Sequence, residues 1–312
     1  MGQIIYRPKG KAREYAPWAA NIFVGCSNDC VYCYCKKGVL GHGMGQPLPQ
    51  LKKPFQLTCK QVLFNKDCEA ARKLAFVTGC AKAADVFDKE LNRYREKIMA
   101  AGKGIFFTFS SDPCLLEPVN TFHTFMRCAL MAIGIDSDDV PPDYMPPIPV
   151  TFLTKRADWI DTEDGQRLLR AGGKYLCVGF TLTGRDDLEP NASPNMERVE
   201  AMRKIHGMGV HTFASIEPVI DLDDSLEMIK ATLGFCDEYK IGLESGAKHN
   251  KKPITLDGIV QFVNDVQDVV AQKAPQAKIY WKDSITKKVA GLCQYSEQVV
   301  DAGYNIFVEG AK

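Results

Sequence analysis

The sequence has almost no net charge and no long hydrophobic run. Its 312 residues include 39 Lys and Arg against 38 Asp and Glu, which leaves a formal net charge of +1. So balanced a chain has no global field that would draw it to nucleic acid, although a local basic patch can still exist. No stretch of about 18 apolar residues occurs, so we expect no membrane-spanning helix. The first residues also lack the apolar core of a secretory signal peptide, and we therefore expect a cytoplasmic protein.

What the chain does contain is an ordinary globular composition and many cysteines. Apolar residues make up 46% and charged residues 25%, values typical of soluble globular proteins. The length allows one large α/β barrel or two small domains. Most of the 12 cysteines stand singly inside apolar segments, which agrees with a reducing environment. A disulfide framework is disfavoured, because nothing in the sequence suggests secretion.

Four cysteines near the start form the most specific motif: Cys26, Cys30, Cys33 and Cys35. They follow an apolar run at 19–25 that predicts a strand ending on a glycine. The first three have the spacing Cys-x3-Cys-x2-Cys, and three thiolates on one short loop can hold three irons of a cubane cluster. No fourth protein ligand at a matching distance is evident. The iron left open would suit a small chelating cofactor, and Tyr32 offers an apolar face for the ring of that cofactor.

Other interpretations of the cysteines stay open. The four in the loop could bind zinc, although structural zinc sites usually gather two separated pairs of ligands. Cys35 falls outside the three-cysteine spacing, and residues two apart in a helical turn do not share a face, so it should point away from Cys33. A second cluster could use three later cysteines, but their spacings of nine and twelve residues match no known motif. We interpret these as core or loop thiols: Cys59, Cys68 and Cys80.

The rest of the chain predicts strands alternating with helices. Residues 1–18 form a basic arm laid over the body, and residues 34–103 form a long excursion whose first part is turn-rich. Strands are predicted at 20–25, 104–109, 149–154, 175–182, 210–216, 239–243, 278–281 and 305–308. Helices are predicted at 83–101, 119–132, 163–171, 194–207, 223–234 and 255–273.

Such alternation is typical of a parallel sheet covered by helices. The strands are apolar almost throughout, as expected for strands that are buried on both faces. Six or more strand–helix units favour an α/β fold with a partial or near-complete (β/α) barrel of parallel strands. No short repeat or low-complexity tract interrupts the pattern, so we expect a single domain over residues 1–312.

In parallel barrels, functional groups gather in the loops that follow the strands. Nearly every strand predicted here is followed by polar or charged residues, more consistently than random surface loops would be. These residues are Ser110, Ser111, Asp112, Cys114, Lys155, Arg156, Thr181, Thr183, Glu189, Arg198, Glu217, Glu244, Ser245, Lys282, Asp283 and Ser284. The pattern predicts a functional site at this end of the sheet.

Taken in order, several of these pieces resemble one branch of the radical S-adenosylmethionine (SAM) enzymes. The order Gly-Cys-x3-Cys-x-Tyr-Cys-Tyr, Ser-Ser-Asp-Pro, Leu-Thr-Lys and Glu-Pro resembles spore photoproduct lyase and its phage-associated relatives. Segments 216–218, 242–246 and 280–282 look especially like the phage-associated branch. The resemblance covers residues 20–285, and the cysteine loop is its most specific part.

This resemblance implies a role for the cysteine loop. Cys26, Cys30 and Cys33 would ligate three irons of a 4Fe–4S cluster, and the amine and carboxylate of SAM would bind the fourth. Tyr32 would lie against the adenine of SAM.

The resemblance also implies residues for the rest of the cofactor. These are Ser110, Ser111, Asp112, Lys155, Thr181, Arg198 and Glu217. Residues 110–112 would meet the methionine amino group, while Lys155 and Thr181 would meet the carboxylate or the ribose, since a carboxylate pairs with a cation and an ammonium with acceptors. Two of these residues have simpler interpretations: Asp112 can cap a turn, and Arg198 can be an exposed helix residue.

The sequence departs from the lyase at one position. In the lyase, a cysteine just before a Thr-Ser-Asp sequence returns a hydrogen atom to the substrate radical. The equivalent stretch here begins at Phe109 and lacks that cysteine, so the resemblance does not extend to photoproduct repair by the same route. Cys114 could act as the hydrogen donor instead, although a small buried thiol is the commoner fate of a single cysteine.

The resemblance implies an enzyme that cleaves SAM reductively and uses a 5′-deoxyadenosyl radical to take a hydrogen atom from a substrate. It favours a base in nucleic acid or a nucleotide as that substrate, and it implies an electron donor such as flavodoxin or ferredoxin. Two alternatives remain: the same chemistry on a peptide or small metabolite, and a non-catalytic metal-binding module.

Basic residues in the strand-end loops could meet the phosphates of a nucleic acid. They are Lys155, Arg156, Arg185, Lys248, Lys251, Lys252, Lys282, Lys287 and Lys288. Acidic residues occupy the same end of the predicted sheet: Asp186, Asp187, Glu189, Asp221, Asp223 and Asp224. The predicted patch is therefore mixed, and a solvated surface is the simpler interpretation of the lysines.

Overall fold

The computed structural model describes residues 3–62, 68–135, 146–244, 249–250 and 253–308. The chain divides into two compact units. Unit 1 consists of Met1–Ser27 and Cys33–Val150, and unit 2 consists of Asn28–Tyr32 and Thr151–Lys312. Five residues from the middle of the cysteine loop therefore belong to unit 2, while the residues on either side of them belong to unit 1.

Unit 1 contains strands in the order β1-β2-β5. β1 (Ile5–Tyr6) pairs antiparallel with β2 (Ala19–Ala20), which lies parallel to β5 (Ile105–Phe107). The backbone N–H groups at the start of β1 donate to the carboxylate of Glu90, at 2.9 and 2.7 Å. The arm predicted at 1–18 is thus tied to the unit through an edge strand.

The strand predicted at 20–25 is interrupted. Its first part is the end of β2, and its second part, β3 (Phe23–Val24), pairs antiparallel with β4 (Gln50–Leu51) in a separate two-stranded sheet. The excursion at 34–103 therefore supplies a strand that the sequence pattern did not predict.

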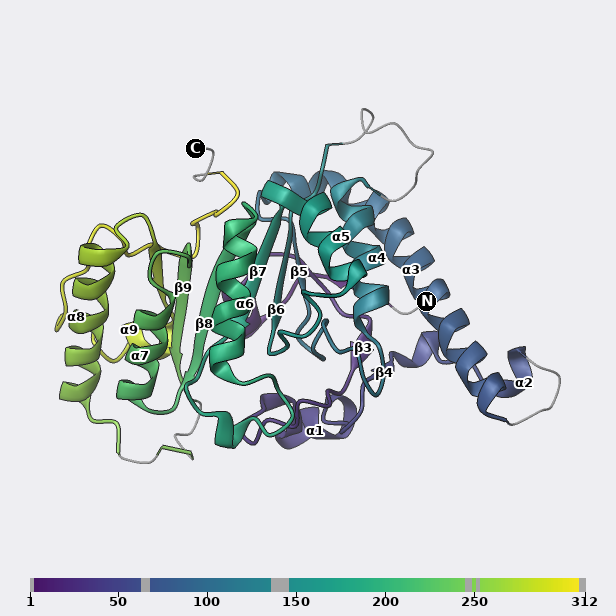
Figure 1. The fold of residues 1–312 in the computed structure, drawn as a ribbon, viewed down its shortest axis with the longest axis horizontal. Helices are drawn as coiled ribbons and strands as arrows, with labels where there is room; N and C mark the ends of the chain where they lie inside the picture. The colour runs from purple at the N-terminus through teal and green to yellow at the C-terminus, as the bar shows by residue number, and fades with distance from the viewer. Residues whose placement is uncertain (1–2, 63–67, 136–145, 245–248, 251–252, 309–312) are drawn as a thin grey trace. The chain divides into compact units, whose positions relative to one another are not determined.

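The helices of unit 1 include one that is much longer than predicted. They are α1 (Gly38–Met44), α2 (Cys59–Val62), α3 (Glu69–Ala100) and α4 (Phe122–Ile133), with 3₁₀ turns η1 (Gly10–Glu14), η2 (Tyr34–Lys36) and η3 (Lys53–Phe55). Figure 1 shows α4 running beside α3. The sequence predicted only 83–101 as helix, but α3 spans 32 residues. Gly79 lies inside it, where a Cβ atom would come within 2.4 Å of the Phe55 carbonyl oxygen. The glycine thus permits close packing instead of ending the helix.

Unit 2 alternates strands and helices as predicted. The strands are β6 (Val150–Thr154), β7 (Leu176–Thr181), β8 (His211–Val219), β9 (Glu238–Leu243) and β10 (Lys278–Trp281), in that order across the sheet. The helices are α5 (Glu163–Gly172), α6 (Asn195–Gly207), α7 (Leu222–Thr232), α8 (Leu256–Lys273) and α9 (Asp283–Thr286), with 3₁₀ turns η4 (Gly173–Tyr175) and η5 (Asp186–Leu188). β7 to β10 pair in parallel. The predicted α/β fold with parallel strands is confirmed.

One face of this sheet packs against helices. The Tyr239 hydroxyl lies 3.4 Å from the Ile229 carbonyl oxygen of α7, and the rings of Trp281 and Phe262 of α8 are 6.1 Å apart. Side chains alternate along a strand, so the residues between these point to the opposite face. Figure 1 shows α6, α7 and α8 along β7, β8 and β9. The opposite face, which we call the polar face, carries Thr181, Ser215, Glu217, Glu238, Lys240, Tyr280 and Lys282.

The last strand predicted, at 305–308, is wrong. These residues form a turn, in which the Val308 N–H donates to the Asn305 carbonyl oxygen at 3.1 Å. The Asn305 side chain also accepts from the Phe307 N–H at 3.2 Å. An Asn side chain that binds nearby backbone groups in this way competes with strand pairing.

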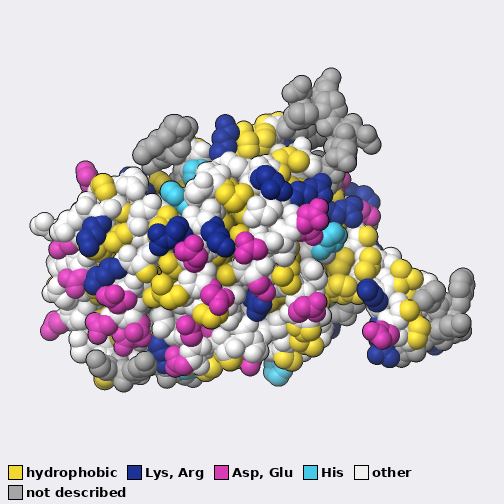
Figure 2. Space-filling model, in the orientation of Figure 1, with side chains coloured by type: hydrophobic (Ala, Val, Ile, Leu, Met, Phe, Trp, Pro, Cys, Tyr) yellow, Lys and Arg dark blue, Asp and Glu magenta, His cyan; other side chains and the backbone are white. Residues whose placement is uncertain are grey.

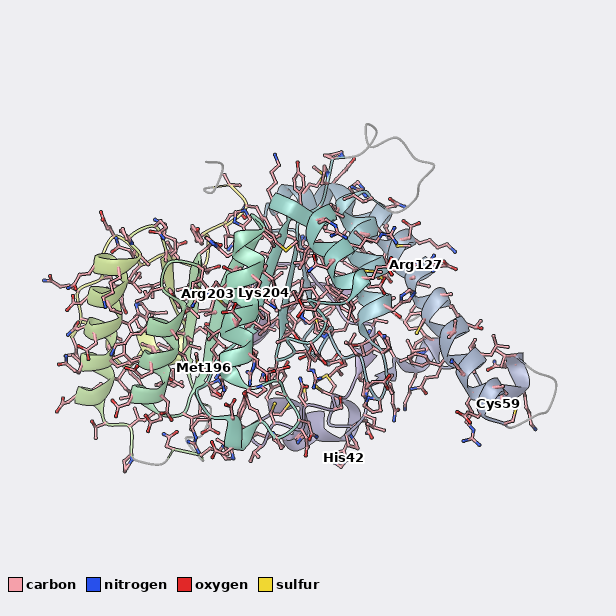
Figure 3. All side chains as sticks on the ribbon, viewed as in Figure 1. His42, Cys59, Arg127, Met196, Arg203 and Lys204 are labelled. Atoms are coloured by element: carbon pink, nitrogen blue, oxygen red, sulfur yellow. The ribbon has the colours of Figure 1, made fainter. Side chains whose placement is uncertain are left out.

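The outer surface of unit 2 is polar and mixed in charge. Met196, Arg203 and Lys204 project from α6 (Figure 3), and Lys204 pairs with Asp161 at 3.5 Å. Basic and acidic side chains are interspersed over α6, α7 and α8 on the face that Figure 2 shows. Among the described residues, no helix combines the length and the apolar character needed to span a bilayer.

Candidate functional site

The cysteine loop begins at a glycine that no other residue could replace without strain. Gly25 has φ 85°, and a Cβ atom there would lie 2.5 Å from the Leu48 carbonyl oxygen. Its N–H donates to the Ser110 carbonyl oxygen at 3.0 Å, and the N–H of Cys26 donates to the Gln46 carbonyl oxygen at 3.1 Å. The predicted strand end on a glycine is therefore correct, and it directs the chain into the loop.

None of the cysteines of the loop forms a disulfide. Cys30 is buried, while Cys26 and Cys33 are half-buried. In the described part of the chain, no group of three or more His, Cys, Asp or Glu side chains is already arranged around a common point as a metal site. Three unoxidised thiols within eight residues are nevertheless the donor set that an iron–sulfur cluster takes. The predicted ligands fit the cluster chemically, and their role stays a prediction.

Cys35 does not point away from Cys33, and that expectation was wrong. A hydrogen bond between the two thiols, followed by burial, raises the pKa of Cys35. The Cys35 thiol also lies 3.5 Å from the Phe109 carbonyl oxygen. The expectation assumed a helical turn through Cys33, but the 3₁₀ turn begins only at Tyr34 and Cys33 has extended backbone angles (φ −55°, ψ 123°).

Five residues of unit 2 form a closed network around Tyr32, which we call the Tyr32 cluster: Tyr32, Glu189, Arg198, Thr181 and Lys155. The Tyr32 hydroxyl donates to Glu189, whose other carboxylate oxygen accepts from Arg198. Arg198 also donates to the Thr181 carbonyl oxygen at 2.5 Å, and the Thr181 hydroxyl accepts from the Lys155 ammonium at 3.2 Å. That ammonium lies 5.6 Å from the centre of the Tyr32 ring, which closes the network.

The backbone beside Tyr32 is held by the same part of unit 2. The Val31 N–H donates to the Leu188 carbonyl oxygen at 2.9 Å, and the Asn191 N–H donates to the Asn28 carbonyl oxygen at 3.3 Å. Burial, and then the charge of Glu189, raises the pKa of Tyr32 well above its usual value. Tyr32 is therefore a neutral phenol, which donates its hydrogen bond to the carboxylate.

The cluster contains four residues that the sequence predicted as cofactor-binding: Tyr32, Lys155, Thr181 and Arg198. The structure shows that Arg198 is fully buried, so the alternative of an exposed helix residue is wrong. The fifth member, Glu189, was expected only as one of many polar residues after a strand. A buried arginine requires an acidic partner, but only the folded chain shows that Arg198 is buried, so the local sequence carried no signal for this role of Glu189.

A second group of charged residues lies on the polar face of unit 2. The Lys282 ammonium is 2.5 Å from the Glu217 carboxylate, and the Lys240 ammonium is 2.5 Å from Glu238. Lys240 lies 5.6 Å from the ring centres of Phe213 and Tyr280. Sequence reasoning found Glu217 and Lys282 but missed Lys240 and Glu238. Charged residues two apart inside an otherwise apolar strand were the available signal.

The predicted residues 110–114 lie together in unit 1. Ser110 is buried and donates to the Phe23 carbonyl oxygen at 2.5 Å. The Asp112 carboxylate accepts from the Cys114 N–H at 2.9 Å, so this aspartate does cap a turn. The Ser111 hydroxyl lies 3.5 Å from the Asp112 carbonyl oxygen. Cys114 is fully buried. A role for these residues toward a ligand stays a prediction.

The expected ring of basic residues is only partly exposed. Arg185 is buried and bound to Asp187 at 2.7 Å, and Lys282 has only 2% of its side chain exposed. These two residues cannot belong to an exposed phosphate-binding surface, because buried, paired cations are not free for phosphate. Lys287 is exposed but pairs with Asp283 at 2.6 Å. Three further lysines of the expected patch lie outside the described residues: Lys248, Lys251 and Lys252.

The cysteines of the excursion remain thiols of helices and loops. Cys59 lies in α2 (Figure 3), Cys68 precedes α3, and Cys80 lies within α3. Burial raises the pKa of Cys80, as expected for a thiol in an apolar setting.

Comparison with solved structures identifies the fold. No family model matches the sequence, and no curated protein matches it. A variant of spore photoproduct lyase, with bound AdoMet and dinucleoside spore photoproduct, is similar over 85% of this chain and 76% of that chain, with 14% identity and a TM-score of 0.53. The chain has the fold of spore photoproduct lyase. The resemblance predicted from the cysteine loop is thus confirmed at the level of the fold.

Two structures of SuiB from Streptococcus suis are more distantly similar. One covers 67% of this chain with 13% identity and a TM-score of 0.45. The other, bound to S-adenosylmethionine, covers 72% with 12% identity and a TM-score of 0.45. This chain spans only 47% and 55% of those two SuiB chains.

Proposed function

We propose that this chain is a radical SAM enzyme. Cys26, Cys30 and Cys33 bind a 4Fe–4S cluster, and SAM binds its fourth iron. The observation that carries the proposal is the loop Cys-x3-Cys-x-Tyr-Cys in a chain that has the fold of spore photoproduct lyase, a protein whose structure holds AdoMet. When bound, the cluster and SAM supply a 5′-deoxyadenosyl radical that takes a hydrogen atom from the substrate.

The Tyr32 cluster provides the groups that SAM requires. The Lys155 ammonium suits the methionyl carboxylate, and the Thr181 hydroxyl suits the same carboxylate or the ribose. The largely apolar ring of Tyr32 suits the adenine, because aromatic rings stack favourably. In this proposal the cation–π contact of Lys155 with Tyr32, at 5.6 Å, keeps the two groups together before SAM binds.

The resemblance also supports cofactor-binding roles for Ser110, Ser111 and Asp112, and for Glu217. Ser110, Ser111 and Asp112 accept from the methionine amino group. The Asp112 carboxylate also accepts from the Cys114 N–H, at 2.9 Å. Glu217 supplies a further acceptor, with 22% of its side chain exposed beside Lys282.

The proposed substrate is a base in nucleic acid or a nucleotide. Support comes from spore photoproduct lyase, whose structure holds a dinucleoside photoproduct. A flavodoxin or ferredoxin would supply the electron. The competing substrate classes are a peptide and a small metabolite, and the competing function is a non-catalytic metal-binding module.

Anaerobic reconstitution with iron and sulfide tests the proposal. We expect a brown protein with absorbance near about 400 nm, which on reduction converts SAM to 5′-deoxyadenosine and methionine. A colourless protein that binds zinc would instead support the metal-binding module. A brown protein that leaves SAM intact under reduction would contradict the radical SAM assignment.

A further inference from the structure

We infer that Glu189 and Arg198 are positioning residues that fix the Tyr32 ring in the orientation that SAM requires. The inference rests on the proposed function, because it assigns these two residues to the adenine side of the proposed SAM site. In this inference Arg198, which the resemblance implies as a cofactor-binding residue, acts through Tyr32, as Glu189 does.

Arg198 is committed to protein oxygens on three sides. Its side chain is 0% exposed, as is that of Glu189. Nε donates to the Ser193 carbonyl oxygen at 2.7 Å, and one terminal nitrogen donates to the Thr181 carbonyl oxygen at 2.5 Å. The other terminal nitrogen donates to Glu189. So many fixed contacts hold the guanidinium in one place, and the guanidinium in turn fixes the carboxylate of Glu189.

Glu189 has one carboxylate oxygen for Arg198 and the other for Tyr32. A carboxylate that binds a buried arginine has a defined plane, since the guanidinium is itself planar. The free oxygen therefore presents a fixed acceptor to the Tyr32 hydroxyl. The hydrogen bond fixes the far end of the ring and so restricts rotation about the Cα–Cβ bond, while the Lys155 ammonium lies over one ring face.

The contacts suggest a purpose beyond stability. Tyr32 is 8% exposed, and a phenylalanine would bury the same ring without a hydroxyl to satisfy. A buried ion pair also need not stabilise the fold, because a protein with apolar residues of similar volume in its place is often as stable or more stable. The Glu189–Arg198 pair fixes the direction of the Tyr32 side chain. Through Tyr32 it also steadies segment 28–32, whose backbone binds the residues beside Glu189 at Val31 and Asn28.

A double-mutant cycle with Tyr32→Phe and Glu189→Gln tests the inference on the reconstituted protein. SAM affinity is measured by anaerobic calorimetry, and iron content is measured in parallel. Tyr32→Phe should weaken SAM binding about tenfold. Glu189→Gln should weaken it less, because the amide oxygen still accepts from the phenol. In the Tyr32→Phe background, Glu189→Gln should have no further effect, since the two residues act through one hydrogen bond.

Matched controls separate positioning from general damage. Tyr175→Phe removes a phenol hydroxyl outside the cluster, and Glu197→Gln removes an exposed carboxylate from the first turn of α6. Both should leave SAM affinity unchanged. Additive effects of Tyr32→Phe and Glu189→Gln, or unchanged SAM affinity in both, would overturn the inference.

A measurement without SAM keeps the inference separate from the proposed function. Hydrogen–deuterium exchange of the apo protein reports the Val31 amide, which binds Leu188 next to Glu189. Faster exchange at Val31 in Tyr32→Phe and in Glu189→Gln, but not in the controls, would support the anchoring even if the wild type failed to bind SAM. Failure of the wild type to bind SAM would overturn the proposed function. Unchanged exchange at Val31 would overturn the anchoring.

Discussion

Lys282, the residue after β10, and Glu217 of β8 meet over Gly242 of β9, the strand between β8 and β10. Their charged groups are 2.5 Å apart, and only 2% of the Lys282 side chain is exposed. A Cβ atom on Gly242 would lie 2.9 Å from Cδ of Lys282 and 3.1 Å from Oε1 of Glu217. The pair therefore forms only because β9 has no side chain at this position.

Gly242→Ala should separate this pair. The added methyl group needs the space that the Lys282 stem and the Glu217 carboxylate occupy, and insertion into a packed site typically destabilises by about 1–3 kcal/mol. We expect a loss of that order in the free energy of unfolding, measured by denaturant titration. Gly207→Ala is the control, because a Cβ atom on Gly207 has no neighbour within 4 Å. Equal stability of the Gly242→Ala and Gly207→Ala variants would contradict the packing argument.

Single Cys→Ala variants should divide the loop cysteines into two classes. Loss of Cys26, Cys30 or Cys33 should abolish iron binding after anaerobic reconstitution, because each removes one ligand of the proposed cluster. Cys35→Ala should retain iron, although its thiol contacts Cys33. Complete loss of iron in Cys35→Ala, together with retention in any of the other three, would show that the ligand set is wrong.

Asp112→Asn and Lys155→Met should weaken SAM binding without loss of iron. Each removes a charge-assisted hydrogen bond to the methionyl end of SAM, which is worth about 1.5–3 kcal/mol or one to two powers of ten in affinity. Asparagine keeps an oxygen that can accept from the Cys114 N–H, so the turn at residue 112 should survive. Anaerobic calorimetry that finds wild-type SAM affinity in both variants would place the methionyl end elsewhere.

His211 should make the fold less stable in acid. Burial, with a smaller effect of the nearby His206, lowers the pKa of His211 below 6.5, although Asp237 acts in the opposite direction. The unfolded chain therefore binds the proton of His211 more readily than the folded chain does. Acid consequently favours unfolding: the free energy of unfolding decreases as the pH falls below 6.5 toward the lower pKa of the folded state. In denaturant titrations at pH 7 and pH 5, His211→Gln should lose less stability on acidification than the wild type. His123→Gln, on an exposed position of α4, is the matched control. An identical acid loss in His211→Gln and the wild type would reject this role.

If nucleic acid is the substrate, the affinity for oligonucleotides should fall steeply as the salt concentration rises. Lysines that meet phosphates release counterions, so each one removed should reduce the salt dependence of log Kd by about one unit. The variant to compare with the wild type replaces Lys248, Lys251 and Lys252 with Ala, on both single- and double-stranded oligonucleotides. No binding at low salt, or an unchanged slope in the variant, would favour a peptide or a small metabolite instead.

Sequence patterns predicted unit 2 well, because its strands and helices are local features. The strand at 278–281 and the helix at 255–273 agree with β10 and α8 to within a residue. The alternation of apolar and polar residues, together with strong helix starts such as the Thr255 cap on α8, defines these elements without help from the rest of the chain.

The excursion in unit 1 was harder to predict, because long-range contacts decide its structure. Gly79 inside α3 leaves room for the Phe55 backbone, and β3 pairs with a strand from residues 50–51. Neither contact leaves a periodic signal in the local sequence. The Tyr32 cluster also depends on long-range contacts. Each of its members was predicted from a strand end or a motif, but only the folded chain shows that Glu189 connects them.

The donor and acceptor of the Tyr32–Glu189 hydrogen bond are 157 residues apart in the sequence. A ribosome that adds about 5–20 residues per second makes the acceptor roughly 8–30 s after the donor. Until the end of that interval the segment carrying Cys30 lacks Leu188, Glu189 and Asn191, which it binds in the folded chain. The cysteine loop is thus synthesised early and the acceptor of Tyr32 much later, so a cluster inserted during that interval would meet a loop whose Tyr32 is not yet anchored.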